Sequence, residues 1–300
     1  MDIGEAIRSV QRLPPQAAIA REAARLRRDE IEGSLAIDRL PLTREQLNAL
    51  IDRGIATGEH RLEHYIAARD LAVASAWVAE QRPLGPSDPR PPITVEDVRR
   101  LHTLVAAGQP EMRPGVWRLA VEPADAGVVA PPPWLIAKET TALVDRFRRR
   151  PAVDDVPAHI AGFLARFTRI RPFAAANGRC ARLAAALILR RLDVVPLAIA
   201  RERSGEYQRA MIAAQTVDAQ PLHDLVETAL VQNCLRLVAA AGNDPLTPLR
   251  DLAGVHYAAL IKAAKRGRLD VVARNGRVYT TAGWIARYSA RYTSGMNAAV

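Results

Sequence analysis

The chain has 300 residues, of which 49% are hydrophobic and 25% are charged. This composition is typical of a globular protein and excludes collagen-like repeats and wholly disordered chains. Apolar stretches such as residues 71–79 are too short to cross a membrane, and the first residues lack the pattern of a secretory signal. Cys180 and Cys234 form no CxxC pair, so neither a disulfide framework nor a zinc site is predicted. We expect a cytoplasmic protein that does not bind membranes.

Positive charge is concentrated near one end of the chain. Residues 245–300 contain nine lysines and arginines and two aspartates, so they carry +7 of the net charge of +10. A short basic segment beside a nearly neutral body suggests a polyanionic partner for that segment. The alternative is a solvated basic surface in an arginine-rich protein.

Most of the chain is predicted to be helical, because alanine, leucine and arginine dominate and β-branched residues rarely alternate with polar ones. Thr43 with Gln46, and Thr94 with Asp97, have the spacing of capping boxes. Helices are therefore expected to begin at both threonines.

Three segments interrupt the helical pattern. Residues 82–92 contain five prolines and predict a linker. Residues 114–133 have short β-type runs around a Pro/Gly turn and predict a small hairpin. Residues 241–248 predict a domain boundary where the basic segment begins.

Residues 165–192 contain a short loop between two apolar helices. Gly178 allows the backbone to approach a ligand, and the second helix begins with unpaired N–H groups. Arg179 and Arg182 are three residues apart and project from neighbouring positions. This combination suits a phosphate group. The alternative is an ordinary helix–loop–helix joint with a capping glycine and solvated arginines.

Residues 171–182 read RPFAAANGRCAR and resemble the Fic/DOC family motif HPFx(D/E)GNGRxxR at six of its nine specified positions. The resemblance extends over residues 20–240. It implies a mainly α fold, a Fic-type helical bundle with a small β-hairpin flap. The expected ranges are an N-terminal helical region with an inhibitory-type helix (1–85), a Fic core (86–240) and a C-terminal winged helix-turn-helix (249–300).

The resemblance also implies what the loop has lost. In active members of the family the motif histidine is the general base for a protein hydroxyl, and the acid holds magnesium on the nucleotide phosphates. Here Arg171 stays protonated, Ala175 offers no metal ligand and Ala176 replaces the first glycine. We expect no catalytic residue, no cofactor and no magnesium, with ATP or another nucleotide as the candidate ligand. The expected phosphate- or nucleotide-binding residues are Asn177, Gly178, Arg179 and Arg182.

Residues 28–33 (RDEIEG) resemble the inhibitory helix pattern (S/T)xxxE(G/N) of many Fic proteins. Glu32 and Gly33 match the pattern, whereas Arg28 replaces the serine or threonine. The resemblance implies an ion pair between Glu32 and Arg182. Without it, the segment is an acidic helix end stopped by a glycine.

Residues 249–292 predict a short helix, a turn, a second helix, a hairpin and a last helix. Asn275-Gly276 is a strong hairpin signal between two apolar pairs. This order resembles the winged helix-turn-helix of excisionase-like and MerR-like proteins, which implies DNA binding. A basic dimerisation or protein-binding appendage is the alternative. The expected DNA contacts come from the second helix and the wing: Lys262, Lys265, Arg266, Arg268, Arg274 and Arg277.

The leading hypothesis is a degenerate Fic protein that does not transfer AMP and acts as a DNA-binding or ligand-sensing regulator. Its expected partners are DNA, a second copy of the chain and a protein. One alternative is a protein adenylyltransferase, or a related phosphate-group transferase, that takes its base from His102 or His159. Another is an interaction partner of an active Fic enzyme.

Overall fold

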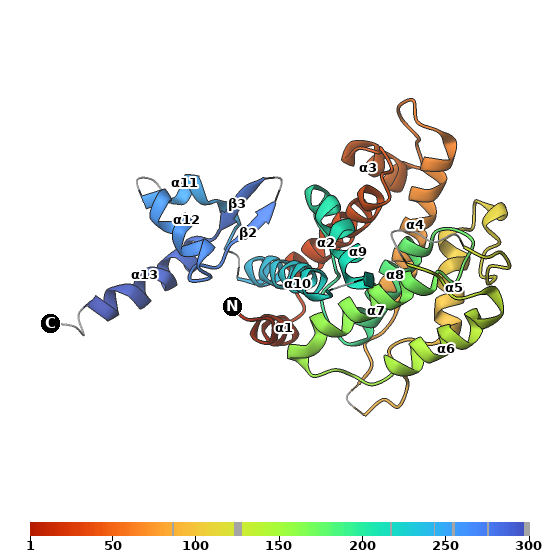
Figure 1. The fold of residues 1–300 in the computed structure, drawn as a ribbon. Helices are drawn as coiled ribbons and strands as arrows, with labels where there is room; N and C mark the ends of the chain where they lie inside the picture. The colour runs from red at the N-terminus through yellow and green to blue at the C-terminus, as the bar shows by residue number, and fades with distance from the viewer. Residues whose placement is uncertain are drawn as a thin grey trace. The chain divides into compact units, whose positions relative to one another are not determined.

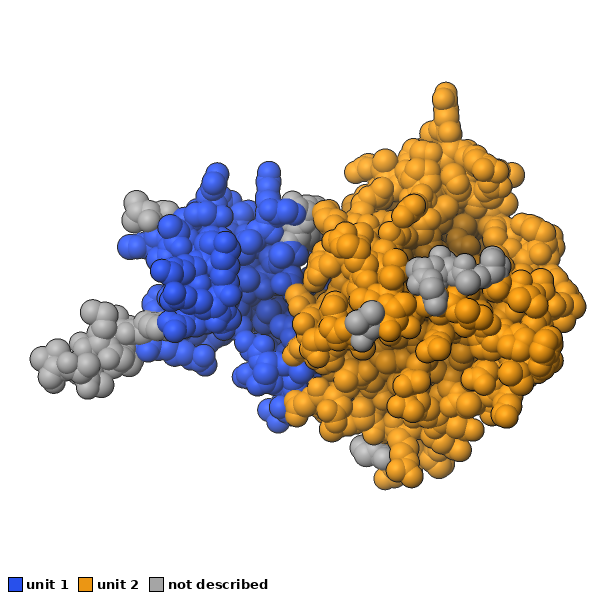
Figure 2. All heavy atoms as spheres, viewed as in Figure 1, with its two compact units in different colours: residues 1–26, 230–300 blue, residues 27–229 orange. Residues whose placement is uncertain are grey.

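The computed structural model describes residues 1–85, 87–122, 128–216, 218–242, 244–253, 256–274 and 276–296. It divides into unit 1, residues 1–26 with 230–300, and unit 2, residues 27–229 (Figures 1 and 2). The helices that dominate both units confirm the mainly α fold class. The division differs from the expected ranges because residues 27–85 share a unit with the expected Fic core. No helix in the described ranges is long and apolar enough to cross a membrane.

Unit 2 is organised around α8, Asn177–Arg191, which packs against α4, α5 and α7. Most of its side chains are buried, because apolar residues fill the middle of the helix. Thr43 and Thr94 form the expected capping boxes, so both predicted helix starts are confirmed. The other α-helices of the first 241 residues are α1 Ile3–Gln11, α2 Ala17–Ile37, α3 Arg44–Arg53, α4 Leu62–Glu80, α5 Val95–Val105, α6 Ile136–Arg146, α7 Val156–Ile170, α9 Ser204–Thr216 and α10 Gln220–Ala241. Short 3-10 helices are η1 Pro110–Met112, η2 Pro133–Leu135, η3 Val153–Asp155 and η4 Arg201–Arg203.

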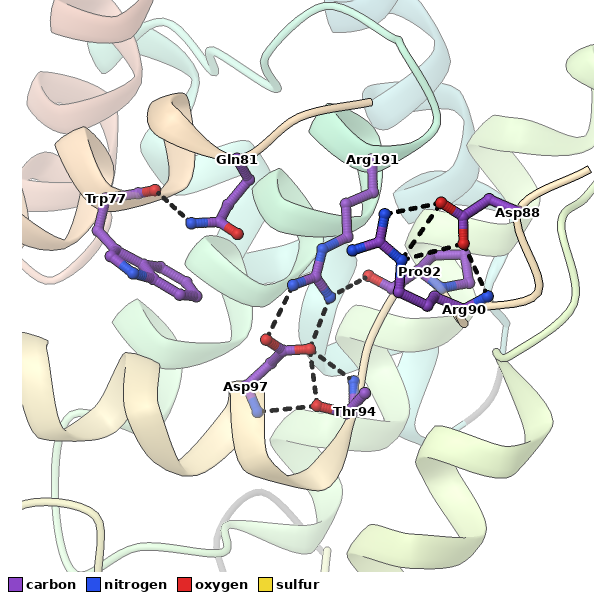
Figure 3. Close-up of polar contacts among 8 residues, drawn as sticks. All are labelled: Trp77, Gln81, Asp88, Arg90, Pro92, Thr94, Asp97 and Arg191. Carbon is purple, nitrogen blue, oxygen red and sulfur yellow. Dashed lines mark hydrogen bonds and ion pairs between the residues drawn. The ribbon is translucent and has the colours of Figure 1, made fainter. Parts of the chain in front are cut away.

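An ion pair fixes the C-terminal end of α8 to the start of α5 (Figure 3). Arg191 donates to the two carboxylate oxygens of Asp97 at 2.6 and 3.0 Å and to the Pro92 carbonyl at 3.3 Å. Asp97 also completes the capping box with Thr94, so one carboxylate serves both elements. The side chains of Arg191 and Asp97 are only 15% and 13% exposed, and a pair this buried holds the two helices in register.

The expected flap hairpin is not seen in the described residues. Residues 113–122 and 128–132 form no regular strand, and Val128 is a single bridge residue. The turn of that hairpin would fall in residues 123–127, which lie outside the described residues.

The C-terminal part of unit 1 contains a small antiparallel sheet with the strand order β1-β3-β2. Leu249, Leu260, Leu269 and Trp284 are buried together in its core. The helices and hairpin occur in the expected order, although Asn275 lies outside the described residues. The elements are β1 Thr247–Pro248, α11 Leu249–Ala253, α12 Tyr257–Lys265, β2 Val272–Arg274, β3 Arg277–Thr280 and α13 Ala282–Met296.

Candidate anion-binding site

The candidate site lies where α7 ends and α8 begins. The residues on either side of the loop, Arg171 and Ala176, both have left-handed backbones, with φ of 47° and 55°. Ala176 stands where the Fic motif has glycine, and its left-handed backbone costs about 1–2 kcal/mol because of the added methyl group. No side chain caps α8 at Ala176. The first N–H groups of the helix therefore form a partial positive charge that favours an anion.

Asn177 uses its side chain to close the loop. Its Oδ1 accepts a hydrogen bond from the Phe173 N–H at 2.9 Å, and its Nδ2 donates to the Phe173 carbonyl at 2.7 Å. The side chain thus shapes the loop.

Arg182 is held by residues at the end of α2. Its Nε donates to Ser34 Oγ at 2.8 Å, and a terminal nitrogen contacts the Ser34 carbonyl at 3.1 Å and Asp38 Oδ1 at 2.7 Å. The expected ion pair with Glu32 is wrong, because Glu32 pairs with Arg44 instead. Arg44 is the first residue of α3 and also binds Asp29 at 2.8 Å, so both of these acidic side chains of α2 pair with α3.

Gly33 has a packing role. A Cβ atom built at this position would lie 1.9 Å from the Ile199 carbonyl oxygen. Glycine is therefore required for the close approach of α2 to the chain before η4. The expected inhibitory role of Gly33 stays a prediction.

Arg179 is buried, with 7% of its surface exposed. Its Nε has no hydrogen-bond partner among the described residues and lies 3.6 Å from Asp38 Oδ2. Burial lowers the pKa of the Arg179 guanidinium, Asp38 opposes this shift, and the charge of Arg182 adds to it. A buried cation without a full set of hydrogen bonds is costly, so this position favours an additional anionic partner.

Asp38 is the residue of the candidate site that the sequence did not reveal. Its carboxylate lies beside both motif arginines, and a Cβ built at Gly178 would lie 3.6 Å from its Oδ1. Asp38 follows the last residue of α2, six positions after Glu32, and no known pattern marks it. An internal carboxylate therefore sits beside the first turn of α8, where a bound phosphate would also lie.

His102 does not replace the missing base. It is fully buried, its ring stacks on Phe173 with centroids 3.7 Å apart, and its Nδ1 accepts from the Gly115 N–H at 3.0 Å. Nε2 then carries the proton and donates to the Ala175 carbonyl at 3.2 Å. Burial lowers the pKa of His102 to about 4, and the charge of Arg179 also lowers it, whereas the Ala175 bond raises it. Both nitrogens are engaged, so neither can take a proton from a substrate.

His159 is also unsuitable as a base. It lies twelve residues before Arg171 along α7, a rise of about 18 Å along the helix axis. Its ring packs edge-on against Phe147, and burial lowers its pKa. The side chain is half-buried, and its Nε2 has no hydrogen-bond partner among the described residues.

The loop does not fit a magnesium ion at the motif's acid position. Ala175 has no side-chain oxygen, and its carbonyl oxygen already accepts the His102 hydrogen bond. Magnesium prefers several oxygen ligands in a near-octahedral arrangement. Ala175 supplies no free oxygen ligand.

Arg118 ties the flap segment to the loop. It is 2% exposed and donates to the carbonyl oxygens of Arg171 and Ala120, both at 2.7 Å, and of Pro131. A cavity of about 230 Å³ opens beside this anchor, with Trp117 and Ala174 among its lining residues. The hydrogen bonds of Arg118 thus support the loop from one side, and a cavity lies next to it.

The basic residues of the C-terminal part occupy exposed positions. On α12, Leu260 and Ala263 are buried, and the opposite face is exposed and basic. The side chain of Arg274 lies outside the described residues. Of the expected DNA-contacting residues, the exposed ones are Lys262, Lys265, Arg266, Arg268 and Arg277.

Comparison with known proteins relates unit 2 to one family. Residues 92–189 match the model of the Fic/DOC family, and no curated protein matches the chain. Similar solved structures include residues 134–508 of Fic-1 from C. elegans, with a TM-score of 0.70 and 18% identity over 80% of this chain and 71% of that one. A Fic-domain signalling protein from Bacteroides thetaiotaomicron has a TM-score of 0.66 and 19% identity, covering 80% of this chain and 96% of that one. A Fic family protein from Desulfovibrio desulfuricans has a TM-score of 0.57 and 20% identity, covering 90% and 97%. At this identity, the likeness to the solved structures shows the fold.

Proposed function

Starting from a chain that contains a Fic/DOC family domain, we propose that this protein does not transfer AMP and acts as a DNA-binding regulator whose Fic domain senses an anion. The observation that carries the proposal is the pair of residues at the motif's two chemical positions, Arg171 and Ala175. Neither can take a proton or hold a metal ion. The phosphate-contacting arginines of the motif, Arg179 and Arg182, are retained.

The size of the chemical loss supports the absence of transfer. A positioned general base contributes typically 10²–10⁴ in rate, and a metal ion contributes several kcal/mol at the transition state. The two histidines considered as substitutes, the buried His102 and the half-buried His159, have lowered pKa values, so they do not restore the base.

Anion sensing is supported by the part of the site that remains. The helix N-terminus and two arginines are sufficient to bind phosphate, because binding requires N–H donors and cations but neither base nor metal. The Fic domain then serves as a binding module, with phosphate, sulfate or the phosphates of a nucleotide as the ligand class.

An activity assay tests the first part of the proposal. The purified protein, incubated with labelled ATP and magnesium or manganese, is expected to label neither itself nor added proteins. The variant Arg171→His/Ala175→Asp/Ala176→Gly restores the motif and serves as the positive control for AMP transfer. Robust transfer by the unmodified protein would overturn the proposal.

DNA binding is supported by the layout of the C-terminal part. The exposed face of α12 is basic and small, with Ala258 and Ala259 beside Lys262 and Lys265, and Arg277 follows on the hairpin. This is the distribution expected of a winged helix-turn-helix, in which a helix enters the major groove and the wing contacts phosphates.

Fluorescence anisotropy with labelled duplex DNA over a salt series tests this part. Each phosphate contact adds about 0.9 to the slope of log affinity against log salt, so Arg277→Gln is expected to reduce the slope by about one for every sequence. Lys265→Gln, nearer the groove, is expected to reduce the preference between sequences. Absence of DNA binding by the full chain would refute the DNA-binding role and favour an interaction protein.

A further inference from the structure

Helices α6 and α7 of unit 2 pack against one another (Figure 1). A second concentration of positive charge lies where these two helices meet. Arg146 is the last residue of α6, and Arg166 and Arg169 lie on the last turns of α7. We name these three residues the α6–α7 arginine patch. All three side chains are exposed.

Core contacts fix the two helices at this point. Phe147, next to Arg146, packs edge-on against Phe163 with ring centroids 5.5 Å apart and planes at 90°. Phe163 lies three residues before Arg166, so this contact brings the two arginines to the same side of the helix crossing. Arg169 is one turn further along α7, about 5–6 Å away between Cβ atoms.

The charges of the patch reinforce one another. Burial lowers the pKa of Arg166, and the charges of Arg146 and Arg169 lower it further, which places all three within electrostatic reach. Among the described residues, none of the three forms an ion pair with a carboxylate. Other arginines of unit 2 are neutralised locally, as Arg90 is by Asp88 and Arg203 by Glu206, both at 2.7 Å.

We propose that the α6–α7 arginine patch binds the phosphate backbone of duplex DNA, as a contact surface separate from the C-terminal part. Duplex DNA carries one negative charge per about 1.7 Å of its axis, so a rigid array of cations gains more from it than from a single small anion. Guanidinium groups suit phosphate because they donate two parallel hydrogen bonds. The inference goes beyond the proposed function because it assigns DNA contact to the Fic-containing unit itself.

The test compares two variants of the full chain that have lost the same charge. Arg146→Gln/Arg166→Gln/Arg169→Gln removes the patch, and Arg61→Gln/Arg90→Gln/Arg203→Gln removes three arginines that pair with carboxylates. Binding of a labelled mixed-sequence duplex is measured by anisotropy over a salt series, and thermal unfolding checks that each variant folds. The patch variant is expected to lose at least tenfold in affinity at low salt and about 2.7 in salt slope, three contacts at about 0.9 each. The control variant is expected to keep the wild-type slope.

The variant Lys262→Gln/Lys265→Gln separates this inference from the proposed function. If it weakens DNA binding and the patch variant does not, the patch inference is wrong and the C-terminal role stands. If only the patch variant weakens binding, the patch inference holds and the C-terminal role fails. A patch variant that loses binding to anionic phosphatidylserine vesicles, but not to DNA, overturns the inference in favour of a membrane surface. An Arg→Lys version of the patch retains the charge and is expected to retain the salt slope.

Discussion

Helix α8 has mostly buried arginines near both ends, and the two ends differ in how these charges are neutralised. At the C-terminal end, Arg191 faces the negative end of the helix dipole and forms two hydrogen bonds with Asp97. At the N-terminal end, Arg179 and Arg182 share the carboxylate of Asp38, Asp70 also acts on Arg179, and both arginines lie at the positive end of the dipole. The Arg191–Asp97 pair is complete without a ligand, whereas Nε of the neighbouring Arg190 is buried without a hydrogen-bond partner among the described residues. The N-terminal end has an excess of positive charge, as an anion-binding site requires.

The comparison predicts the largest loss of stability at the C-terminal end. Asp97→Ala is expected to lower the free energy of unfolding by about 3–5 kcal/mol, because it leaves the mostly buried Arg191 without its partner. It also removes a cap from α5. Urea denaturation measures the change. Asp97→Asn keeps a cap oxygen but loses the charge, so its free energy of unfolding should lie between those of wild type and Asp97→Ala. A loss below about 1 kcal/mol would contradict the structural role of this pair.

A pH dependence is predicted beside the loop. Because burial lowers the pKa of His102 to about 4 from 6.5, the unfolded chain takes up a proton first as the pH falls. Stability from neutral His102 is thus present above pH 6.5 and is lost between about pH 6.5 and 4, to the extent of about 3 kcal/mol.

A variant is needed to isolate the contribution of His102, because Glu30 changes the free energy of unfolding with pH in the opposite direction. Burial raises the pKa of Glu30 to about 7, so its neutral form adds stability as the pH falls. Urea denaturation at pH 7.5, 6 and 5 should therefore be compared between wild type and His102→Gln. The difference in stability between the two proteins is expected to shrink as the pH falls. A difference that is constant with pH would show that His102 does not stay neutral on folding.

The smallest effect on stability is expected at Arg179. Replacement by methionine removes a buried guanidinium that has an unpaired Nε, so Arg179→Met is expected to change the free energy of unfolding by less than about 1 kcal/mol, or to stabilise the fold. Thermal or urea unfolding at pH 7.5 provides the measurement. A loss comparable to that of Asp97→Ala would mean that the two ends of α8 do not differ as described.

Local patterns in the sequence predicted the elements whose causes are local. Capping at Thr43 and Thr94 and the helix and hairpin order after residue 249 depend on residues within a few positions of one another. The Fic resemblance located the loop, where Ala176 has a left-handed backbone even without glycine.

Side-chain partners across elements could not be read in the same way. Glu32 pairs with Arg44, which lies twelve residues further along the chain, and not with Arg182. Asp38 reaches Arg182 because of where α2 ends, 144 residues away in the sequence. Such pairings depend on packing between helices, and no spacing in a single sequence encodes them.

Calorimetric titration of inorganic phosphate at pH 7.5 tests the central claim, that the N-terminal end of α8 binds an anion in competition with Asp38. Two like charges about 4 Å apart near a protein surface repel by about 4 kcal/mol, so Asp38→Asn is expected to bind phosphate at least about tenfold more tightly than wild type. Glu32→Gln is the matched control and should bind as wild type does, and Asp38→Asn/Arg179→Met should lose the gain. Equal affinities of wild type and Asp38→Asn, or tighter binding by Glu32→Gln, would contradict the account.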